Sequence, residues 1–178
     1  VIQYYRNETG LKVADLGTGS GAILVGFLYY CRDAVGVGID ISAEALKIAE
    51  ENGQNLKITD RVEWRQGDYL KAFDEEDIFD GIFSNPPYIP TKDIGGLPGE
   101  VKHEPRLALG GTDGLYFYHL LAKGAAEHLK PGGFLAVEFG IGQATDILEM
   151  FQKSAQYEDF EVIKDYGGIE RALYCRKK

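Results

Sequence analysis

The chain has 178 residues, of which 44% are hydrophobic and 26% are charged, a composition typical of one globular domain rather than of a disordered segment. No apolar run approaches the roughly 20 residues that a membrane-spanning helix needs, so we expect no membrane association. The first ten residues are polar, unlike a secretory signal peptide. The formal net charge of −9 disfavours stable nucleic-acid binding, because an acidic chain gains little from neutralising phosphates.

Two further compositional features bear on the origin of the chain. Cys31 and Cys175 stand far apart and match no zinc or redox spacing, so we expect two reduced thiols in a cytoplasmic protein. The chain begins at Val1 and its only methionine is Met150, which we interpret as a fragment of a longer protein.

Strand-like and helix-like patterns alternate almost to the end of the chain. Residues 11–15 predict a strand that enters a glycine-rich turn, and residues 22–31 predict the helix that follows. Further strands are predicted at residues 34–39, 62–66, 81–84, 134–139, 160–164 and 172–176. Further helices are predicted at residues 43–52 with Ser42 as N-cap, at 115–129 ending before Lys130-Pro131-Gly132-Gly133, and at 143–153. This alternation predicts an α/β fold with a largely parallel sheet and helices on both faces.

One long segment interrupts the alternation. Roughly 25 to 30 residues without clear periodicity follow the strand at residues 81–84, which is far longer than an ordinary connection. The segment is rich in proline, which stiffens the chain, so we expect a structured functional loop.

The glycine-rich turn has the sequence Asp15-Leu16-Gly17-Thr18-Gly19-Ser20-Gly21. Its spacing is GxGxG rather than the GxGxxG of dinucleotide sites, and an acidic residue precedes it. The glycines allow a ligand to approach the backbone, and the Asp15 carboxylate suits a cationic ligand better than a pyrophosphate. A tight strand-to-helix turn without a ligand explains the glycine spacing equally well.

Two acidic residues follow the next strands. Asp40 ends the second predicted strand, where nucleotide-binding α/β domains place an acid that accepts hydrogen bonds from both ribose hydroxyls. Asp68 and Tyr69 follow the third strand, where the carboxylate can accept from an adenine amino group and the phenol can flank the ring. The alternatives are a helix-capping or solvated aspartate and an ordinary Gly-Asp turn.

The sharpest signal is Asn85-Pro86-Pro87-Tyr88, which comes directly after the fourth strand. The prolines hold an extended segment whose carbonyls act as acceptors, Asn85 adds a side-chain acceptor, and Tyr88 adds a flat surface. Two acceptors and a stacking surface suit a planar NH₂ group. The alternative is a proline turn with a buried tyrosine.

These motifs together resemble the class I S-adenosylmethionine-dependent methyltransferases of the NPPY type. The segments EPRLAL at residues 104–109, GGTDGLYFY at 110–118 and LKPGGFLAVEFG at 129–140 narrow the resemblance to the HemK/PrmC family, the protein-(glutamine-N5) methyltransferases of peptide chain release factors. The resemblance extends from about residue 11 to 176. It implies a Rossmann-like fold with a seven-stranded, mostly parallel sheet.

The resemblance also implies the chemistry. S-adenosyl-L-methionine is the expected methyl donor, S-adenosyl-L-homocysteine the product, and the acceptor is the glutamine of a Gly-Gly-Gln motif in a release factor, whose methylation modulates translation termination. Asn85, Pro86 and Tyr88 are the expected catalytic residues, and together with Pro87 they bind the substrate. The expected donor-binding residues are Asp15, Gly17, Thr18, Gly19, Gly21, Asp40, Ile41, Asp68, Tyr69 and Asn85.

Other features leave the roles of several residues open. The family carries a helical N-terminal domain for substrate recognition, so we expect residues 1–178 to be the catalytic domain alone. Glu104 and Arg106 either order the long loop, contact the partner or pair with each other. His103, His119 and His128 show no metal-ligand spacing, so no metal is expected. Glu138 and Trp64 are most simply structural.

Two other functions compete with this interpretation. An NPPY enzyme can methylate an exocyclic amine of DNA or RNA, but the net charge and the lack of a basic, aromatic-interleaved segment argue against it. A methyltransferase-like fold can also serve as a binding module without activity. The presence of Asp15, Gly17, Gly19, Asp40 and the NPPY segment argues against that alternative.

Overall fold

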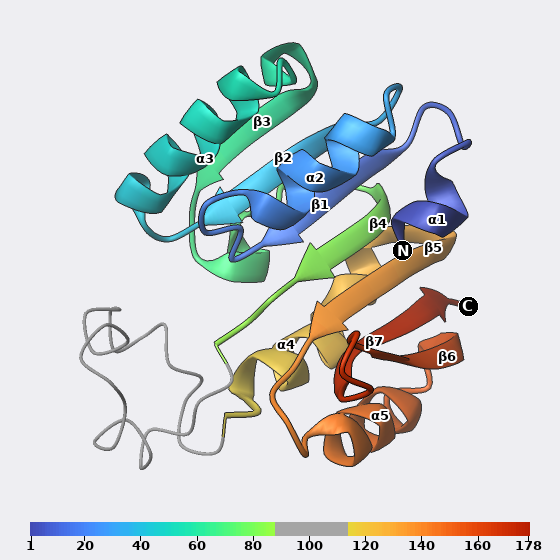
Figure 1. Ribbon diagram of the computed structural model, residues 1–178. Helices are drawn as coiled ribbons and strands as arrows, with labels where there is room; N and C mark the ends of the chain where they lie inside the picture. The colour runs from blue at the N-terminus through green and yellow to red at the C-terminus, as the bar shows by residue number, and fades with distance from the viewer. Residues whose placement is uncertain (88–113) are drawn as a thin grey trace, which may run out of the picture.

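The computed structural model describes residues 1–87 and 114–178, which form one twisted sheet with helices on both faces (Figure 1). The strands are β1 (Lys12–Leu16), β2 (Val35–Asp40), β3 (Val62–Gln66), β4 (Phe79–Ser84), β5 (Leu129–Glu138), β6 (Tyr157–Lys164) and β7 (Glu170–Lys177). The helices are α1 (Ile2–Tyr5), α2 (Ala22–Tyr30), α3 (Ala43–Asn55), α4 (Tyr116–Gly124) and α5 (Ala144–Lys153).

The seven strands lie in the order β3-β2-β1-β4-β5-β7-β6. Strands β1 to β5 pair in parallel, and β7 runs antiparallel to both of its neighbours. The strand order therefore reverses between β1 and β4, the switch point at which open α/β sheets bind ligands. The predicted fold class, a mostly parallel seven-stranded sheet, is confirmed.

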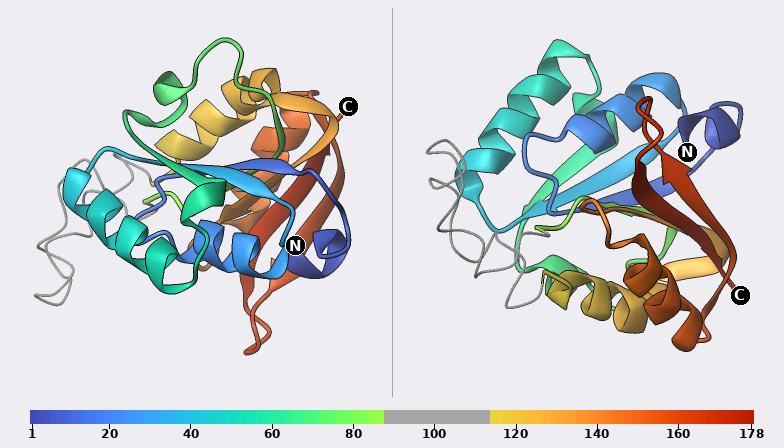
Figure 2. Two further views of the ribbon diagram at one scale, coloured as in Figure 1. Left: turned by 90° about the horizontal axis from the view of Figure 1, so that it is seen from above. Right: turned by 60° about the horizontal axis from the view of Figure 1, so that its bottom comes forward.

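The helices form two layers that enclose the sheet. Figure 2 shows α2 and α3 on one face and α4 and α5 on the other. Each face has its own hydrophobic core. Phe27, Phe83 and Phe134 belong to the core under α2, whereas Tyr118 and Phe151 belong to the core under α4 and α5. No helix among the described residues is long and apolar enough to cross a bilayer.

Most predicted elements are present with their ends moved by a few residues. Ser42 caps α3 as predicted, because its hydroxyl accepts a hydrogen bond from the Ala45 amide. Short elements without a periodic signal were not predicted: α1 and the 3-10 turns at Thr59–Arg61, Tyr69–Ala72 and Ala125–His128. The predicted functional loop falls on residues 88–113, outside the described residues.

The boundary between α4 and β5 was predicted wrongly. The expected helix over residues 115–129 ends at Gly124 and continues as the 3-10 turn, and β5 begins at Leu129 rather than at Phe134. Proline and glycine residues at 131–133 indicated a loop. In the sheet they form an irregularity inside β5, since the β4 partner of Leu129 is Phe79 and that of Phe134 is Gly81. Gly132 has a φ of 73°, the left-handed conformation that glycine permits at such a bulge.

Gly81 in β4 allows the closest packing in the core under α2. A Cβ atom at this position would overlap the ring of Phe134, which lies across the Gly81 backbone. Phe134 is fully buried and contacts the rings of Phe27 and Phe83. The missing side chain at Gly81 therefore sets the depth at which this aromatic group packs.

Gly81→Ala should lower the free energy of unfolding by about 1–3 kcal/mol, because the new methyl group must displace a ring in a closely packed core. Gly26→Ala is the matched control, since a Cβ at this position of α2 meets no atom within 4 Å. It should raise stability by about 0.5–1 kcal/mol through helix propensity. Urea denaturation of both variants measures the difference, and equal stabilities would contradict the packing role of Gly81.

Candidate functional site

The carboxyl ends of three parallel strands meet at the switch point. Leu16 at the end of β1 is in register with Ile39 on β2 and with Ser84 on β4. The glycine-rich turn, Asp40 and Asn85 follow these positions, so the segments predicted to bind a ligand lie together at one edge of the sheet. Figure 1 shows this edge at the arrowheads of β1, β2 and β4.

The glycine-rich turn is held in an open conformation by the backbone. Gly17, Gly19 and Gly21 have φ values of 70°, 56° and 76°, which side chains other than glycine rarely adopt. The amides of Gly17 and Thr18 both donate to the Ile39 carbonyl at 2.9 Å, which fastens the turn to the end of β2. A Cβ at Gly19 would meet no atom within 4 Å, so the backbone of the turn is uncovered at this residue.

Asp15 presents a buried carboxylate beneath this turn. Its Oδ2 accepts a hydrogen bond from the Thr18 hydroxyl at 2.7 Å, and its Oδ1 has no hydrogen-bond partner among the described residues. Burial raises the pKa of Asp15 to about 7, against smaller opposing effects of the Thr18 hydroxyl and the Leu24 amide. A buried carboxylate with an unpaired oxygen is suited to a ligand that brings positive charge or a hydrogen-bond donor.

Asp40 is fixed by two backbone amides. Its Oδ2 accepts from the Gly19 amide at 2.8 Å and its Oδ1 accepts from the Ser42 amide at 2.9 Å. Each oxygen keeps a second lone pair, which allows it to accept from a ligand hydroxyl. The contact with Gly19 also joins β2 to the glycine-rich turn, so the carboxylate and the turn form one rigid unit.

The remaining predicted donor-binding residues have different surroundings. Ile41, next to Asp40, is 53% exposed. Asp68 is exposed, and its Oδ2 accepts from the Lys71 ammonium at 2.5 Å. Tyr69 is buried, and its hydroxyl contacts Ser84 Oγ at 2.5 Å. The Tyr69 ring lies next to Gly17: its Cε2 atom is 3.7 Å from the position that a Cβ on Gly17 would take. The roles of Asp68 and Tyr69 toward an adenine stay predictions.

The Tyr69–Ser84 contact was not predicted from the sequence. Ser84 Oγ also donates to the Leu16 carbonyl at 2.8 Å, so a buried polar chain joins β1, β4 and the turn after β3. A serine at the end of an apolar strand was the one available signal. The contact holds the last residue of β4 in place, directly before Asn85.

The residues after β4 are described only in part. Asn85 is exposed, Pro86 is buried and Pro87 is half-buried, all at the carboxyl end of β4. Tyr88, Glu104 and Arg106 lie outside the described residues, so their predicted roles stay predictions. Residues 1–87 and 114–178 contain no cluster of three potential metal ligands.

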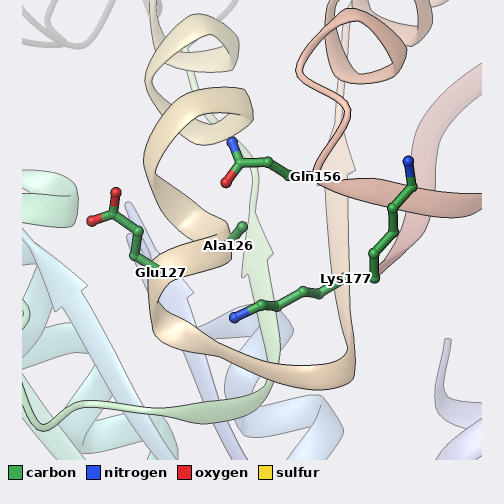
Figure 3. A pocket seen from close by; sticks show the side chains of 5 residues that line it. Ala126, Glu127, Gln156 and Lys177 are labelled. Atoms are coloured by element: carbon green, nitrogen blue, oxygen red, sulfur yellow. The ribbon is translucent and has the colours of Figure 1, made fainter.

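A shallow pocket of about 260 Å³ lies at the opposite edge of the sheet, near the start of β5 (Figure 3). Two of its polar side chains already have partners within the protein. Gln156 Nε2 donates to the Ala122 carbonyl at 3.1 Å, and Lys177 Nζ donates to the Leu129 carbonyl at 2.7 Å. The pocket is therefore no candidate for the chemistry. It is lined by Ala126, Glu127, Gln156, Lys177 and Lys178.

The fold defines a doubly wound α/β domain, and the residues at its switch point form a candidate ligand site. The chain belongs to the methyltransferase domain family, whose family model matches residues 7–133.

A comparison with curated proteins adds a narrower resemblance. The chain is 41% identical over 167 residues to the release factor glutamine methyltransferase of Moorella thermoacetica, an alignment that covers 93% of this chain and 59% of that protein. Other proteins with the same name match at 37–45% identity. The resemblance predicted from the motifs is confirmed. The chain spans between 52% and 60% of the length of these relatives.

Solved structures support the fold. A methyltransferase from Pyrococcus furiosus superposes with a TM-score of 0.70 at 23% identity, covering 98% of this chain and 81% of that chain. An RNA methyltransferase from Salinibacter ruber, solved in complex with S-adenosyl-L-homocysteine, superposes with a TM-score of 0.57 at 20% identity, covering 94% and 80%.

Asp15→Asn should make stability less dependent on pH. Between 3.8, the ordinary pKa, and about 7 the folded state keeps a proton that the unfolded state has lost, so the wild-type free energy of unfolding falls as pH rises through this window. The free energy of unfolding of Asp15→Asn does not fall in this window, because asparagine does not ionise. Its stability relative to wild type should therefore increase by on the order of 2–4 kcal/mol between pH 4 and pH 8.

Urea denaturation at several pH values measures this effect, with the exposed Asp33→Asn as control. Parallel pH dependences for wild type and Asp15→Asn would show that Asp15 is ionised throughout the range.

Proposed function

We propose that this chain transfers a methyl group from S-adenosyl-L-methionine to the side-chain amide nitrogen of a glutamine in a peptide chain release factor. The observation that carries the proposal is the position of Asn85 and Pro86 at the end of β4, beside the switch-point site built on Asp15 and Asp40. The sequence similarity to release factor glutamine methyltransferases supports the glutamine as acceptor. We place the activity in the cytoplasm, where release factors act.

The donor site fits S-adenosyl-L-methionine in its charges and its hydrogen-bond acceptors. The unpaired Oδ1 of Asp15 suits the cationic methionine part of the donor, and Asp40 suits the ribose hydroxyls. Ile41, Asp68 and Tyr69 are the residues that would contact the adenine. The structural similarity to a protein solved with S-adenosyl-L-homocysteine supports this choice of ligand. When bound, the donor supplies an electrophilic methyl group.

Asn85 and Pro86 would prepare the acceptor for this reaction. An amide nitrogen is a poor nucleophile because its lone pair is delocalised into the carbonyl group. The Asn85 side-chain oxygen and the Pro86 carbonyl can accept the two amide hydrogens and orient the nitrogen. As the nitrogen becomes pyramidal and gains positive charge, both acceptors bind it more strongly, which lowers the barrier. Tyr88 would stack on the amide plane.

The proposal is tested with labelled donor and three acceptors side by side: a purified release factor, duplex DNA and RNA. We expect label on the release factor alone. Replacing the glutamine of its Gly-Gly-Gln motif by alanine should abolish the labelling. Label on DNA or RNA instead would establish the exocyclic-amine alternative. Donor binding without any labelling would establish an inactive binding module.

Asp40→Ala should weaken donor binding roughly tenfold or more, because two charge-assisted hydrogen bonds are each worth about 0.5–1.5 kcal/mol or more. The same change removes the acceptor of the Gly19 amide, so Asp40→Asn is the control that keeps one acceptor oxygen in place. Calorimetric titration with the donor measures both affinities. Unchanged affinity in Asp40→Ala would remove this residue from the donor site.

Asn85→Ala should leave donor affinity nearly unchanged and lower the rate of methyl transfer on the order of 100-fold, because its acceptor acts chiefly in the transition state. The exposed position of Asn85 makes a loss of fold unexpected. Single-turnover kinetics with release factor, together with donor titration, separates the two effects. Near-normal turnover would mean that Asn85 only shapes the turn after β4.

A further inference from the structure

Glu138 lies at the same edge of the sheet as the predicted acceptor site. It is the last residue of β5, and the preceding residue, Val137, is in register with Ser84 at the end of β4. Asn85 follows Ser84 directly. Because neighbouring strands are about 4.8 Å apart, the backbones of Glu138 and Asn85 leave the sheet side by side.

The alternation of side chains places Glu138 on the face that carries Asp15. Ala136, two residues before Glu138, belongs to the core under α2, as do Phe83 and Val13. Side chains two residues apart on a strand share a face, so Glu138 and Asp15 both point to the α2 face. Asp15 on β1 and Glu138 on β5 thus lie on the same face of the sheet, with β4 between them.

The backbone of Glu138 is held by a hydrogen bond, and its carboxylate has no ion-pair partner among the described residues. Its backbone carbonyl accepts a hydrogen bond from the Tyr118 hydroxyl at 2.9 Å, which holds the end of β5 against α4. The side chain is half-buried and forms no ion pair within residues 1–87 and 114–178. Arg171 on β7 is the charged neighbour that acts on it, and the Arg171 guanidinium is paired with Asp165 at 3.2 Å. Asn85, the residue that follows β4, is uncharged.

We propose that the Glu138 carboxylate accepts the proton that the glutamine amide nitrogen releases during methyl transfer. This inference rests on the proposed function and assigns a chemical role to Glu138, which the sequence analysis interpreted as structural. Asn85 and Pro86 accept hydrogen bonds from the nitrogen but are too weakly basic to take its proton. A separate proton acceptor is therefore needed. Glu138, at the end of the adjacent strand β5, is the carboxylate that we assign to this role.

The proton transfer completes the balance of the reaction. The bond between nitrogen and the methyl carbon forms as the bond between carbon and sulfur breaks, and the electron pair of the broken bond stays on sulfur. One N–H proton passes to Glu138. In this step the positive charge of the donor sulfur and the negative charge of the Glu138 carboxylate cancel. The step leaves a neutral thioether, an N-methyl amide and a protonated Glu138, and loss of this proton to solvent then restores the carboxylate.

Partial burial strengthens Glu138 as a base. Desolvation raises the pKa of its carboxyl above the ordinary value, and the positive charge of Arg171 lowers it by less. A higher pKa makes the carboxylate a stronger base. An amide nitrogen that is bonding to the methyl carbon is strongly acidic, so a carboxylate is a sufficient acceptor.

Glu138→Gln, which keeps the size of the side chain, tests the proposal with release factor as acceptor. General-base catalysis is worth about 100-fold or more, so kcat should fall by this factor while KM changes less than about threefold. In wild type, kcat should fall as pH drops through the pKa of Glu138, and this dependence should vanish in the variant. Glu170→Gln, an exposed change of equal charge at the same edge, is the matched control and should behave as wild type.

A second variant separates chemistry from structure. Glu138→Ala leaves room for a small carboxylate, so formate should restore kcat about tenfold in this variant but not in Glu138→Gln. The midpoint of the wild-type pH profile should also match the Glu138 carboxyl titration followed by carbon-13 NMR. Unchanged kcat and pH dependence in Glu138→Gln, with an active wild type, would overturn the role of Glu138 alone. Absence of transfer by the wild type would overturn the proposed function and this role with it.

Discussion

Parallel pairing of β1 with β2 on one side and β4 on the other is the constraint on which the site depends. Leu16 is in register with both Ile39 and Ser84, so the three strands end at the same level. Chain segments far apart in sequence therefore meet at one edge. The Gly17 and Thr18 amides on the Ile39 carbonyl, and Ser84 Oγ on the Leu16 carbonyl, fix this alignment with hydrogen bonds.

Carboxylates at this edge occupy environments that differ in solvation and in hydrogen bonding. Asp15 is fully buried with one unpaired oxygen, Asp40 accepts two backbone amides, and Glu138 is half-buried without an ion pair among the described residues. Burial favours the protonated form of a carboxyl group, whereas backbone donors favour the charged form. One edge of one sheet can in this way offer a group for a cationic ligand, an acceptor for hydroxyls and a base.

Helices and strands with clear periodicity were predictable, because burial on one face imposes a repeat that the sequence must carry. The strand at Val62–Gln66 and the Ser42 cap follow such local rules. The start of β5 does not. Lys130 to Gly133 are turn formers by local preference, but the partner strand and the bulge between Phe79 and Gly81 draw them into the sheet. The turn preference of these residues is overridden because pairing with a distant strand gives their backbone hydrogen bonds in the sheet.

The sequence by itself determined the order of the elements, the open glycine-rich turn, and the acids and acceptors at the strand ends, because these depend on backbone preferences and on residue chemistry near in the chain. The tertiary structure alone decided which groups are buried and which face one another. The pKa of Asp15, the Tyr69–Ser84 contact and the position of Glu138 beside Asn85 are of this kind. Each depends on strand register and on desolvation, which arise only when distant segments pack together.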